Sequence, residues 1–124
     1  MRLLLDANSF LWWVSDPGRL TNIARDAIED DANAISVGIG SLWELTIKRA
    51  LKKLEFPADF ETVLRDEAFE LLPIAHTHLR SLEGLPLLHR DPFDRLLIAQ
   101  SLSENIPVVT NDRKFAGYGV SVVW

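Results

Sequence analysis

Short apolar runs alternate along the chain with longer segments in which apolar residues recur every three or four positions. The runs predict buried strands at 2–6, 34–37, 71–74, 108–109 and 120–123. The helical spacing predicts helices at 8–15, 21–29, 41–53, 77–83 and 92–104, and Pro57 is expected in the first turn of a further helix. Strands that alternate with helices are typical of a largely parallel sheet covered on both faces. We therefore predict a single α/β domain over residues 1–124, with a central, mostly parallel sheet of about five strands flanked by helices.

Two segments carry signals for the start of a helix. The segment 41–44, Ser-Leu-Trp-Glu, matches a capping box, in which Ser41 accepts a hydrogen bond from a backbone amide and Glu44 reaches back. Asp91 is a good N-cap, Pro92 suits the first helical position, and Asp94 falls at the third. Taken alone, Glu44 and Asp94 are therefore better explained as helix caps than as ligands.

Four carboxylates are expected at one edge of the predicted sheet. Asp6 closes the first apolar run, and Asp112 follows the run 106–110. Glu44 and Asp94 open helices that face the same edge, where open α/β sheets place their ligands. Carboxylates in one crevice repel one another unless a cation or shared protons offset the charge, and hard ions such as Mg²⁺ bind in oxygen surroundings. The pattern predicts a divalent-metal site, although Asp112 by itself is also a good turn residue.

Residues beside the carboxylates offer further polar groups. Asn8 could hydrogen-bond a ligand carboxylate or a substrate phosphate, or simply cap the first helix. Thr110 presents a hydroxyl next to Asp112, or only fills a strand position. The three histidines lie outside the acidic motifs, and their spacing matches no zinc pattern. We therefore expect the histidines to lie at the surface or at a helix start. They are His76, His78 and His89.

Composition narrows the classes of function. The chain of 124 residues has no cysteine, which excludes disulfides, thiolate zinc sites and cysteine nucleophiles and fits a reducing cytoplasm. The first residues are expected to form a strand and not a signal peptide, and no apolar run approaches the roughly 20 residues of a membrane helix. A net charge of -5 argues against a protein that coats nucleic acid non-specifically. Basic residues near the acidic motifs either form a rim around the acidic centre or simply lie on solvent-exposed helix faces. These residues are Lys48, Arg49, Lys52, Lys53, Arg90, Arg95, Arg113 and Lys114.

Four motifs together resemble the PIN domain of VapC-type toxins. They are Leu3-Leu4-Leu5-Asp6-Ala7-Asn8, Ser41-Leu42-Trp43-Glu44-Leu45, Asp91-Pro92-Phe93-Asp94-Arg95-Leu96-Leu97-Ile98-Ala99-Gln100 and Val109-Thr110-Asn111-Asp112-Arg113-Lys114-Phe115. Each motif is weak alone, but the four occur in order and span the chain, including its last apolar segment. The resemblance implies one PIN-like nuclease domain over residues 1–124.

The resemblance also implies a function. Such proteins are Mg²⁺- or Mn²⁺-dependent endoribonucleases, the toxins of type II toxin-antitoxin pairs, usually dimeric and silenced by a small antitoxin in the cytoplasm. The resemblance implies that the catalytic and metal-binding residues are Asp6, Glu44, Asp94 and Asp112. Ala7 stands where a threonine is frequent and Asn111 where many relatives have a basic residue, but neither change removes a carboxylate. Asp91 is better explained as an N-cap and is left out of the metal set.

The mechanism expected from this set is hydrolysis of RNA by metal-activated water. Asp6, Asp94 and Asp112 would hold one or two ions, and Glu44 would complete the shell directly or through water. Substrate contacts are expected from Asn8, Lys48, Arg95, Thr110 and Arg113. An alternative is a catalytically inactive module whose acidic crevice docks a basic partner segment. A receiver-like phosphoacceptor domain fits poorly, because it requires paired acids after the first strand and a lysine after a late one.

Overall fold

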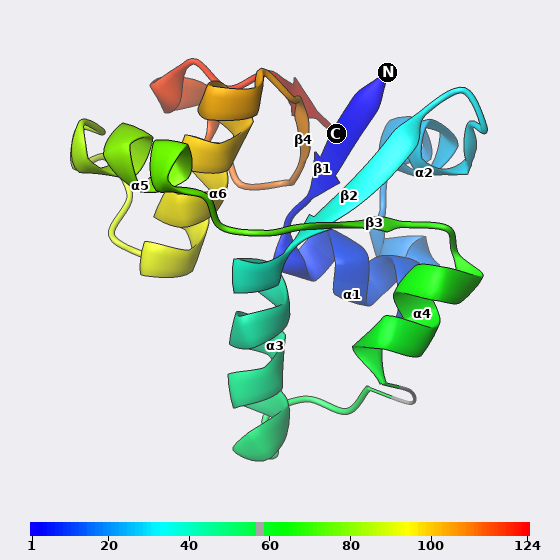
Figure 1. The fold of residues 1–124 in the computed structure, drawn as a ribbon. Coiled ribbons are helices and arrows are strands. Elements are labelled where there is room, and N and C mark those ends of the chain that lie inside the picture. The colour runs from blue at the N-terminus through cyan, green and yellow to red at the C-terminus, as the bar shows by residue number, and fades with distance from the viewer. Residues whose placement is uncertain (57–58) are drawn as a thin grey trace.

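The five predicted strands form one sheet in the computed structural model, which describes residues 1–56 and 59–124 (Figure 1). The sheet is parallel throughout, with the order β3-β2-β1-β4-β5. Its strands are β1 Arg2–Leu5, β2 Ala34–Gly38, β3 Glu70–Leu72, β4 Val108–Val109 and β5 Val122–Val123. The α/β class and the mostly parallel sheet of about five strands are confirmed. Strand β4 has the predicted bounds, and the boundaries of the other strands differ from the prediction by at most two residues.

Helices connect the strands. They are α1 Ala7–Ser15, α2 Asn22–Glu29, α3 Ile39–Ala50, α4 Phe60–Asp66, α5 His76–Glu83 and α6 Pro92–Glu104. Two short 3-10 turns follow α1 and β4, namely η1 Pro17–Arg19 and η2 Ala116–Tyr118. Among the described residues, no helix is long and apolar enough to span a membrane. The expected role of Pro57 in starting a helix lies outside the described residues, and α4 begins after Asp59, which accepts a hydrogen bond from the amide of Thr62.

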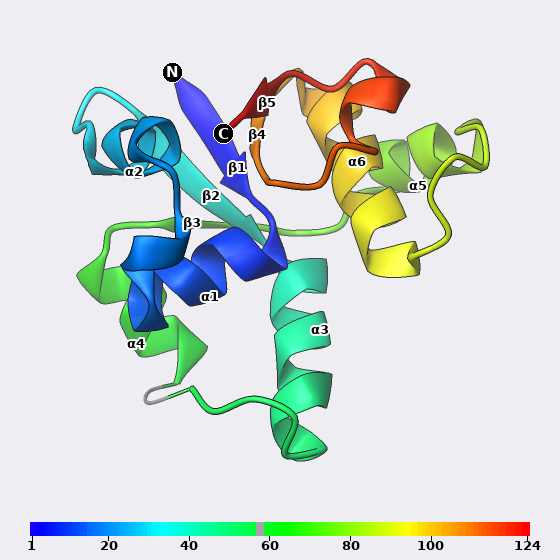
Figure 2. The same ribbon diagram turned by 180° about the vertical axis from the view of Figure 1, so that it is seen from behind.

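The sheet has an apolar core on each face. Leu3 and Leu5 point into the core formed with α1, α2 and α4, while Leu4 points into the core formed with α6. This division follows from the two-residue period of a strand. All three leucines are fully buried, and burial of each contributes about 1.5–3 kcal/mol. Figures 1 and 2 show α1, α2 and α4 to one side of the sheet and α5 and α6 to the other.

The predicted capping box at Ser41 is wrong. Helix α3 begins at Ile39, immediately after β2, and its N-cap Gly38 makes no side-chain hydrogen bond. The reason is the close packing of this helix start against α6. A Cβ atom on Gly40 would lie 2.8 Å from Cδ2 of Leu96, so the absence of a side chain allows α3 to approach. Glu44 is consequently the sixth residue of the helix and is not a cap.

The predicted start of α6 is confirmed. Asp91 is the N-cap, and its Oδ1 accepts hydrogen bonds from the amides of Phe93 at 2.8 Å and Asp94 at 3.3 Å. Pro92 occupies the first helical position, where no amide hydrogen is needed. The helix ends at Glu104, and its C-cap Asn105 adopts the left-handed conformation with φ 55°. This geometry fixes Asp94 on the first turn of α6.

Candidate metal centre

The four predicted carboxylates lie around one cavity of about 310 Å³ at the carboxyl edge of the sheet. The cavity is lined by Asp6, Ala7, Asn8, Glu44, Lys48, Asp91, Asp94, Asn111 and Asp112. Figure 2 shows that the end of β1 and the starts of α1 and α3 come close together here. The four carboxylates come from four separate parts of the chain, so the cavity depends on the tertiary fold and not on any local motif.

Asp6 is the most buried of these carboxylates, with 5% of its surface exposed. It directly follows β1 and caps α1, since its Oδ1 accepts a hydrogen bond from the amide of Ser9 at 2.8 Å. Its Oδ2 accepts a hydrogen bond from Oγ1 of Thr110 at 2.6 Å. Burial raises the pKa of Asp6 above its usual value, and the hydrogen bonds from Thr110 and Ser9 oppose the rise. The folded chain thus holds a carboxylate in place while giving it little compensating positive charge.

Asp94 faces the same cavity from the first turn of α6. Desolvation raises the pKa of Asp94 to about 7, and the negative charges of Asp91, Asp6 and Glu44 add to this effect while His89 opposes it. A carboxyl group that is half protonated near neutral pH indicates a site with excess negative charge. Bound cations relieve this repulsion, and an all-oxygen set of donors is the kind that Mg²⁺ and Mn²⁺ prefer. The residues present therefore fit a divalent ion.

Glu44 forms an ion pair with a basic residue of its own helix. Its Oε2 lies 2.9 Å from Nζ of Lys48, one turn later on α3. Both side chains line the cavity, so Lys48 supplies a positive charge at its wall. Asn8, also expected to contact substrate, is exposed and lines the same cavity. Arg113 does not line it, but lines a neighbouring cavity of about 240 Å³ together with Trp124.

Two residues expected to contact substrate are engaged elsewhere. Thr110 is 1% exposed, and its hydroxyl donates to Asp6 and accepts from the amide of Asp112 at 3.0 Å. The guanidinium of Arg95 binds the carbonyl oxygens of Leu85, Pro86 and His89 and the hydroxyl of Tyr118. Both side chains therefore support the loops around the cavity, and their donors are not directed to a phosphate.

His89 is a residue of the site that the sequence prediction missed. Its side chain is 10% exposed, and its Nε2 lies 2.8 Å from Oδ2 of Asp112 and 3.0 Å from Oδ2 of Asp94. Each of the three residues offers one atom that could bind a metal ion, and these three atoms lie within 4.8 Å of one another. His78 is also buried, but it lies at a helix start as expected, in the first turn of α5, where its Nδ1 accepts a hydrogen bond from the amide of Ala75. His76 is exposed at the start of the same helix, also as expected, whereas His89 is buried in the loop before α6.

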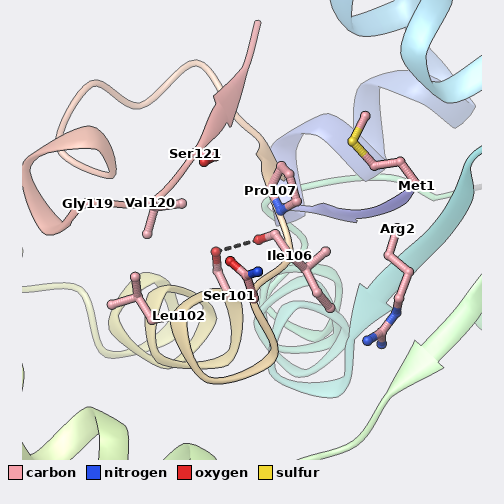
Figure 3. A pocket seen from close by; sticks show the side chains of 10 residues that line it. Met1, Arg2, Ser101, Leu102, Ile106, Pro107, Gly119, Val120 and Ser121 are labelled. Atoms are coloured by element: carbon pink, nitrogen blue, oxygen red, sulfur yellow. Dashed lines mark hydrogen bonds between the residues drawn. The ribbon is translucent and has the colours of Figure 1, made fainter.

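A second cavity lies at the opposite edge of the sheet. It has a volume of about 420 Å³ and is lined by Met1, Arg2, Ser101, Leu102, Asn105, Ile106, Pro107, Gly119, Val120 and Ser121. Figure 3 shows the hydroxyl of Ser101 directed to the carbonyl oxygen of Ile106, at a distance of 2.6 Å. None of the lining residues is acidic. This cavity therefore lacks the acidic side chains that line the cavity at the carboxyl edge.

Comparisons with known proteins agree with this architecture. The model of the family described as PIN domain matches residues 3–120. Ribonuclease VapC22 of Mycobacterium tuberculosis is 26% identical over 119 residues, which cover 94% of this chain and 91% of that protein.

Solved structures give the same result for the fold. The chain resembles VapBC2 from Rickettsia felis bound to a DNA fragment from their promoter, with a TM-score of 0.66, 15% identity, and coverage of 98% of this chain and 97% of the other. DNA-bound VapBC from Salmonella typhimurium gives a TM-score of 0.69, 18% identity, and coverage of 98% and 96%. At these identities the structural matches establish a shared fold.

Proposed function

Because the chain belongs to the PIN domain family, we propose that it is a metal-dependent endoribonuclease and the toxin of a type II toxin-antitoxin pair. The observation that carries the proposal is the convergence of Asp6, Glu44, Asp94 and Asp112 on one cavity. The raised pKa of Asp94 supports it, because it marks a site with more negative charge than the protein itself neutralises. Ribonuclease VapC22, a relative across nearly the whole chain, supports RNA as the substrate class.

Asp6, Asp94 and Asp112 would hold Mg²⁺ or Mn²⁺, with Glu44 as a further ligand directly or through water. When bound, such an ion supplies an activated water and stabilises the oxygens that enter and leave phosphorus. The protein keeps its own carboxylates in position: Thr110 and Ser9 donate to Asp6, and the amide of Lys114 donates to Oδ1 of Asp112 at 2.9 Å.

Lys48 and Asn8 are the residues we assign to the substrate. Both line the cavity, and neither has a buried structural role of the kind found for Thr110. The ammonium group of Lys48 lies on Glu44, from which it could turn to a phosphate oxygen once a cation neutralises that carboxylate. Arg113 lies beside the cavity and remains a candidate for the flanking phosphates, whereas the contacts of Arg95 argue against such a role for it.

A protein partner is the second part of the proposal. Exposed apolar side chains recur every four residues along α3, at Ile39, Trp43 and Ile47, and continue at its C-cap Leu51. Contiguous exposed apolar surface marks an interaction site, and the solved relatives are VapBC assemblies, so we assign this face to an antitoxin. Homodimerisation, which the resemblance implies, belongs to the same proposal, and sedimentation of the antitoxin-free chain tests it.

The decisive experiment compares two substitutions that each replace an aspartate of the cavity by asparagine. The purified chain is incubated with a mixed structured RNA pool in Mg²⁺, in Mn²⁺ and in chelator, alongside Asp94→Asn and Asp91→Asn. We expect metal-dependent cleavage that Asp94→Asn abolishes and Asp91→Asn largely preserves, because asparagine is an equally good N-cap. Cleavage in chelator, or by Asp94→Asn at the wild-type rate, would overturn the assignment.

Calorimetry separates the nuclease from the alternative of an inactive docking module. A metal centre should bind Mn²⁺ with an affinity that Asp94→Asn reduces strongly. A crevice built for basic side chains of a partner should show little affinity for the ion. Negligible Mn²⁺ binding by the wild-type chain would therefore favour the docking module.

A further inference from the structure

His89 lies between two of the proposed metal ligands. Its Nε2 is 2.8 Å from Oδ2 of Asp112 and 3.0 Å from Oδ2 of Asp94. Asp94 belongs to the first turn of α6, whereas Asp112 follows β4, so no backbone element joins the two carboxylates directly. One carboxylate oxygen of Asp94 lies within 4.8 Å of one of Asp112. Two like charges this close repel, and a hydrogen-bond donor shared between them offsets that repulsion.

The other ring nitrogen of His89 fixes what Nε2 can do. Nδ1 accepts a hydrogen bond from the backbone amide of Asp91 at 3.2 Å. A backbone amide can only donate, so Nδ1 carries no hydrogen and the hydrogen of the neutral ring is on Nε2. The imidazole therefore presents an N–H group to the carboxylates of Asp112 and Asp94.

The same observation argues against His89 as a metal ligand. A histidine that ligates through Nε2 usually donates its Nδ1 hydrogen to a carbonyl or carboxylate, which orients the ring. Here Nδ1 faces a donor instead, which is the opposite arrangement. Ligation through Nε2 would require His89 to lose its hydrogen or to break the contact with Asp91.

The position of His89 is itself fixed by surrounding groups. Its backbone amide donates to the hydroxyl of Tyr118 at 2.7 Å, and the amide of Leu88 donates to the same oxygen at 3.0 Å. The guanidinium of Arg95 reaches that hydroxyl at 3.2 Å and the carbonyl oxygen of His89 at 3.4 Å. The ring of Phe115 meets the imidazole edge to face, with 6.3 Å between the ring centres. These contacts restrain the position of His89, although it lies in the loop before α6.

We propose that His89 is a positioning residue that, through its Nε2–H group, holds Asp94 and Asp112 at the separation needed to bind a divalent ion. This inference rests on the proposed metal centre and adds a residue to it. His89 acts through the two carboxylates and has no contact with the metal or the RNA. Its removal should therefore weaken metal binding while leaving the folded chain intact.

The test compares three substitutions at this position. In His89→Gln the side-chain amide reaches as far as Nε2 and keeps an N–H donor, whereas His89→Asn has the same amide on a shorter side chain. His89→Leu removes all hydrogen bonding by this side chain. His76→Gln serves as the control, since His76 is exposed on α5. Each variant is examined by Mn²⁺ calorimetry, by thermal melting in chelator, and by pulsed electron paramagnetic resonance of the bound Mn²⁺.

We expect His89→Leu and His89→Asn to weaken Mn²⁺ binding by about 10- to 100-fold, as is typical for residues that orient metal ligands. His89→Gln should retain most of the affinity, His76→Gln should match the wild type, and the resonance spectrum should show no directly bound nitrogen. Equal Mn²⁺ affinity in His89→Leu, equal losses in the Gln and Asn variants, or nitrogen coupling that disappears in His89→Leu would each overturn the positioning role. A wild-type chain that binds no Mn²⁺ would instead overturn the metal centre on which the role depends.

Discussion

Thr110 donates a hydrogen bond to Asp6 across a separation of 104 residues, with 2.6 Å between Oγ1 and Oδ2. The two residues follow β4 and β1, which are neighbours in the sheet. The same hydroxyl oxygen accepts the amide of Asp112 at 3.0 Å. One buried hydroxyl therefore links the carboxylate of Asp6 to the backbone of Asp112, another residue of the cavity.

Thr110→Val tests this link, because valine has nearly the shape of threonine but no hydroxyl. Asp6 loses a donor and the amide of Asp112 loses its acceptor in a buried place, so we expect a loss of about 1–3 kcal/mol in the free energy of unfolding. Mn²⁺ affinity should fall as well. Urea denaturation and calorimetry measure the two effects, and Thr110→Ser, which keeps the hydroxyl, is the control. Unchanged stability in the valine variant would contradict a structural role for this hydroxyl.

The convergence of the four carboxylates could be foreseen from sequence because it follows from topology. Asp6 and Asp112 end apolar runs, and parallel strands bring their carboxyl ends to one edge. The family resemblance read from the four motifs is likewise confirmed by the family match over residues 3–120. The N-cap at Asp91 was predictable because capping depends on local residues only.

The errors have a different origin, since they concern contacts between distant segments. The capping box at Ser41 fails because Gly38 and Gly40 let α3 begin early against α6, which no local pattern reveals. His89 belongs to a loop without periodicity, and its partner Asp112 lies 23 residues further along the chain. Its only signal in the sequence is its place two residues before the N-cap of α6.

Lys48→Met separates the roles of this side chain toward metal and toward RNA. Loss of the positive charge beside Glu44 should strengthen Mn²⁺ binding, while RNA cleavage should show a raised KM because a phosphate contact is lost. Stability should change by less than about 0.5 kcal/mol, as is usual for a pair one helical turn apart. Lys53→Met makes the same change at an exposed residue beyond α3 and controls for net charge. A KM equal to that of the control would exclude Lys48 from substrate binding.

Tyr118→Phe removes the oxygen on which the amides of Leu88 and His89 and the guanidinium of Arg95 meet. The segment before α6 should then become more mobile, so we expect faster amide hydrogen exchange at residues 86–90 and weaker Mn²⁺ binding. Loss of this part-buried acceptor should cost about 1–3 kcal/mol of stability. Exchange followed by mass spectrometry localises the effect. Faster exchange spread evenly over the chain, with none concentrated at this segment, would show that Tyr118 supports the whole fold and not this loop in particular.

The raised pKa of Asp94 predicts how stability depends on pH in the absence of metal. Burial and neighbouring carboxylates raise this pKa from 3.8 to about 7, so between these values the folded chain keeps a proton that the unfolded chain releases. The resulting stabilisation is complete below pH 3.8 and is lost as the pH rises through about 7. In chelator, the wild-type chain should therefore melt at a lower temperature at pH 8 than at pH 6.

Asp94→Asn isolates this contribution because asparagine cannot ionise. The variant should lose much of the pH dependence and should melt above the wild type at pH 8, although it no longer binds the metal. Asp66→Asn, with an exposed carboxylate at the end of α4, should keep the wild-type dependence. Mn²⁺ should raise the melting temperature of the wild type most at pH 8, where Asp94 is ionised, and should leave Asp94→Asn nearly unchanged. The melting temperatures of the wild type and Asp94→Asn could instead change in parallel from pH 6 to 8. That result would mean that Asp94 is already ionised at pH 6 and that like charges in the cavity repel one another less than its geometry indicates.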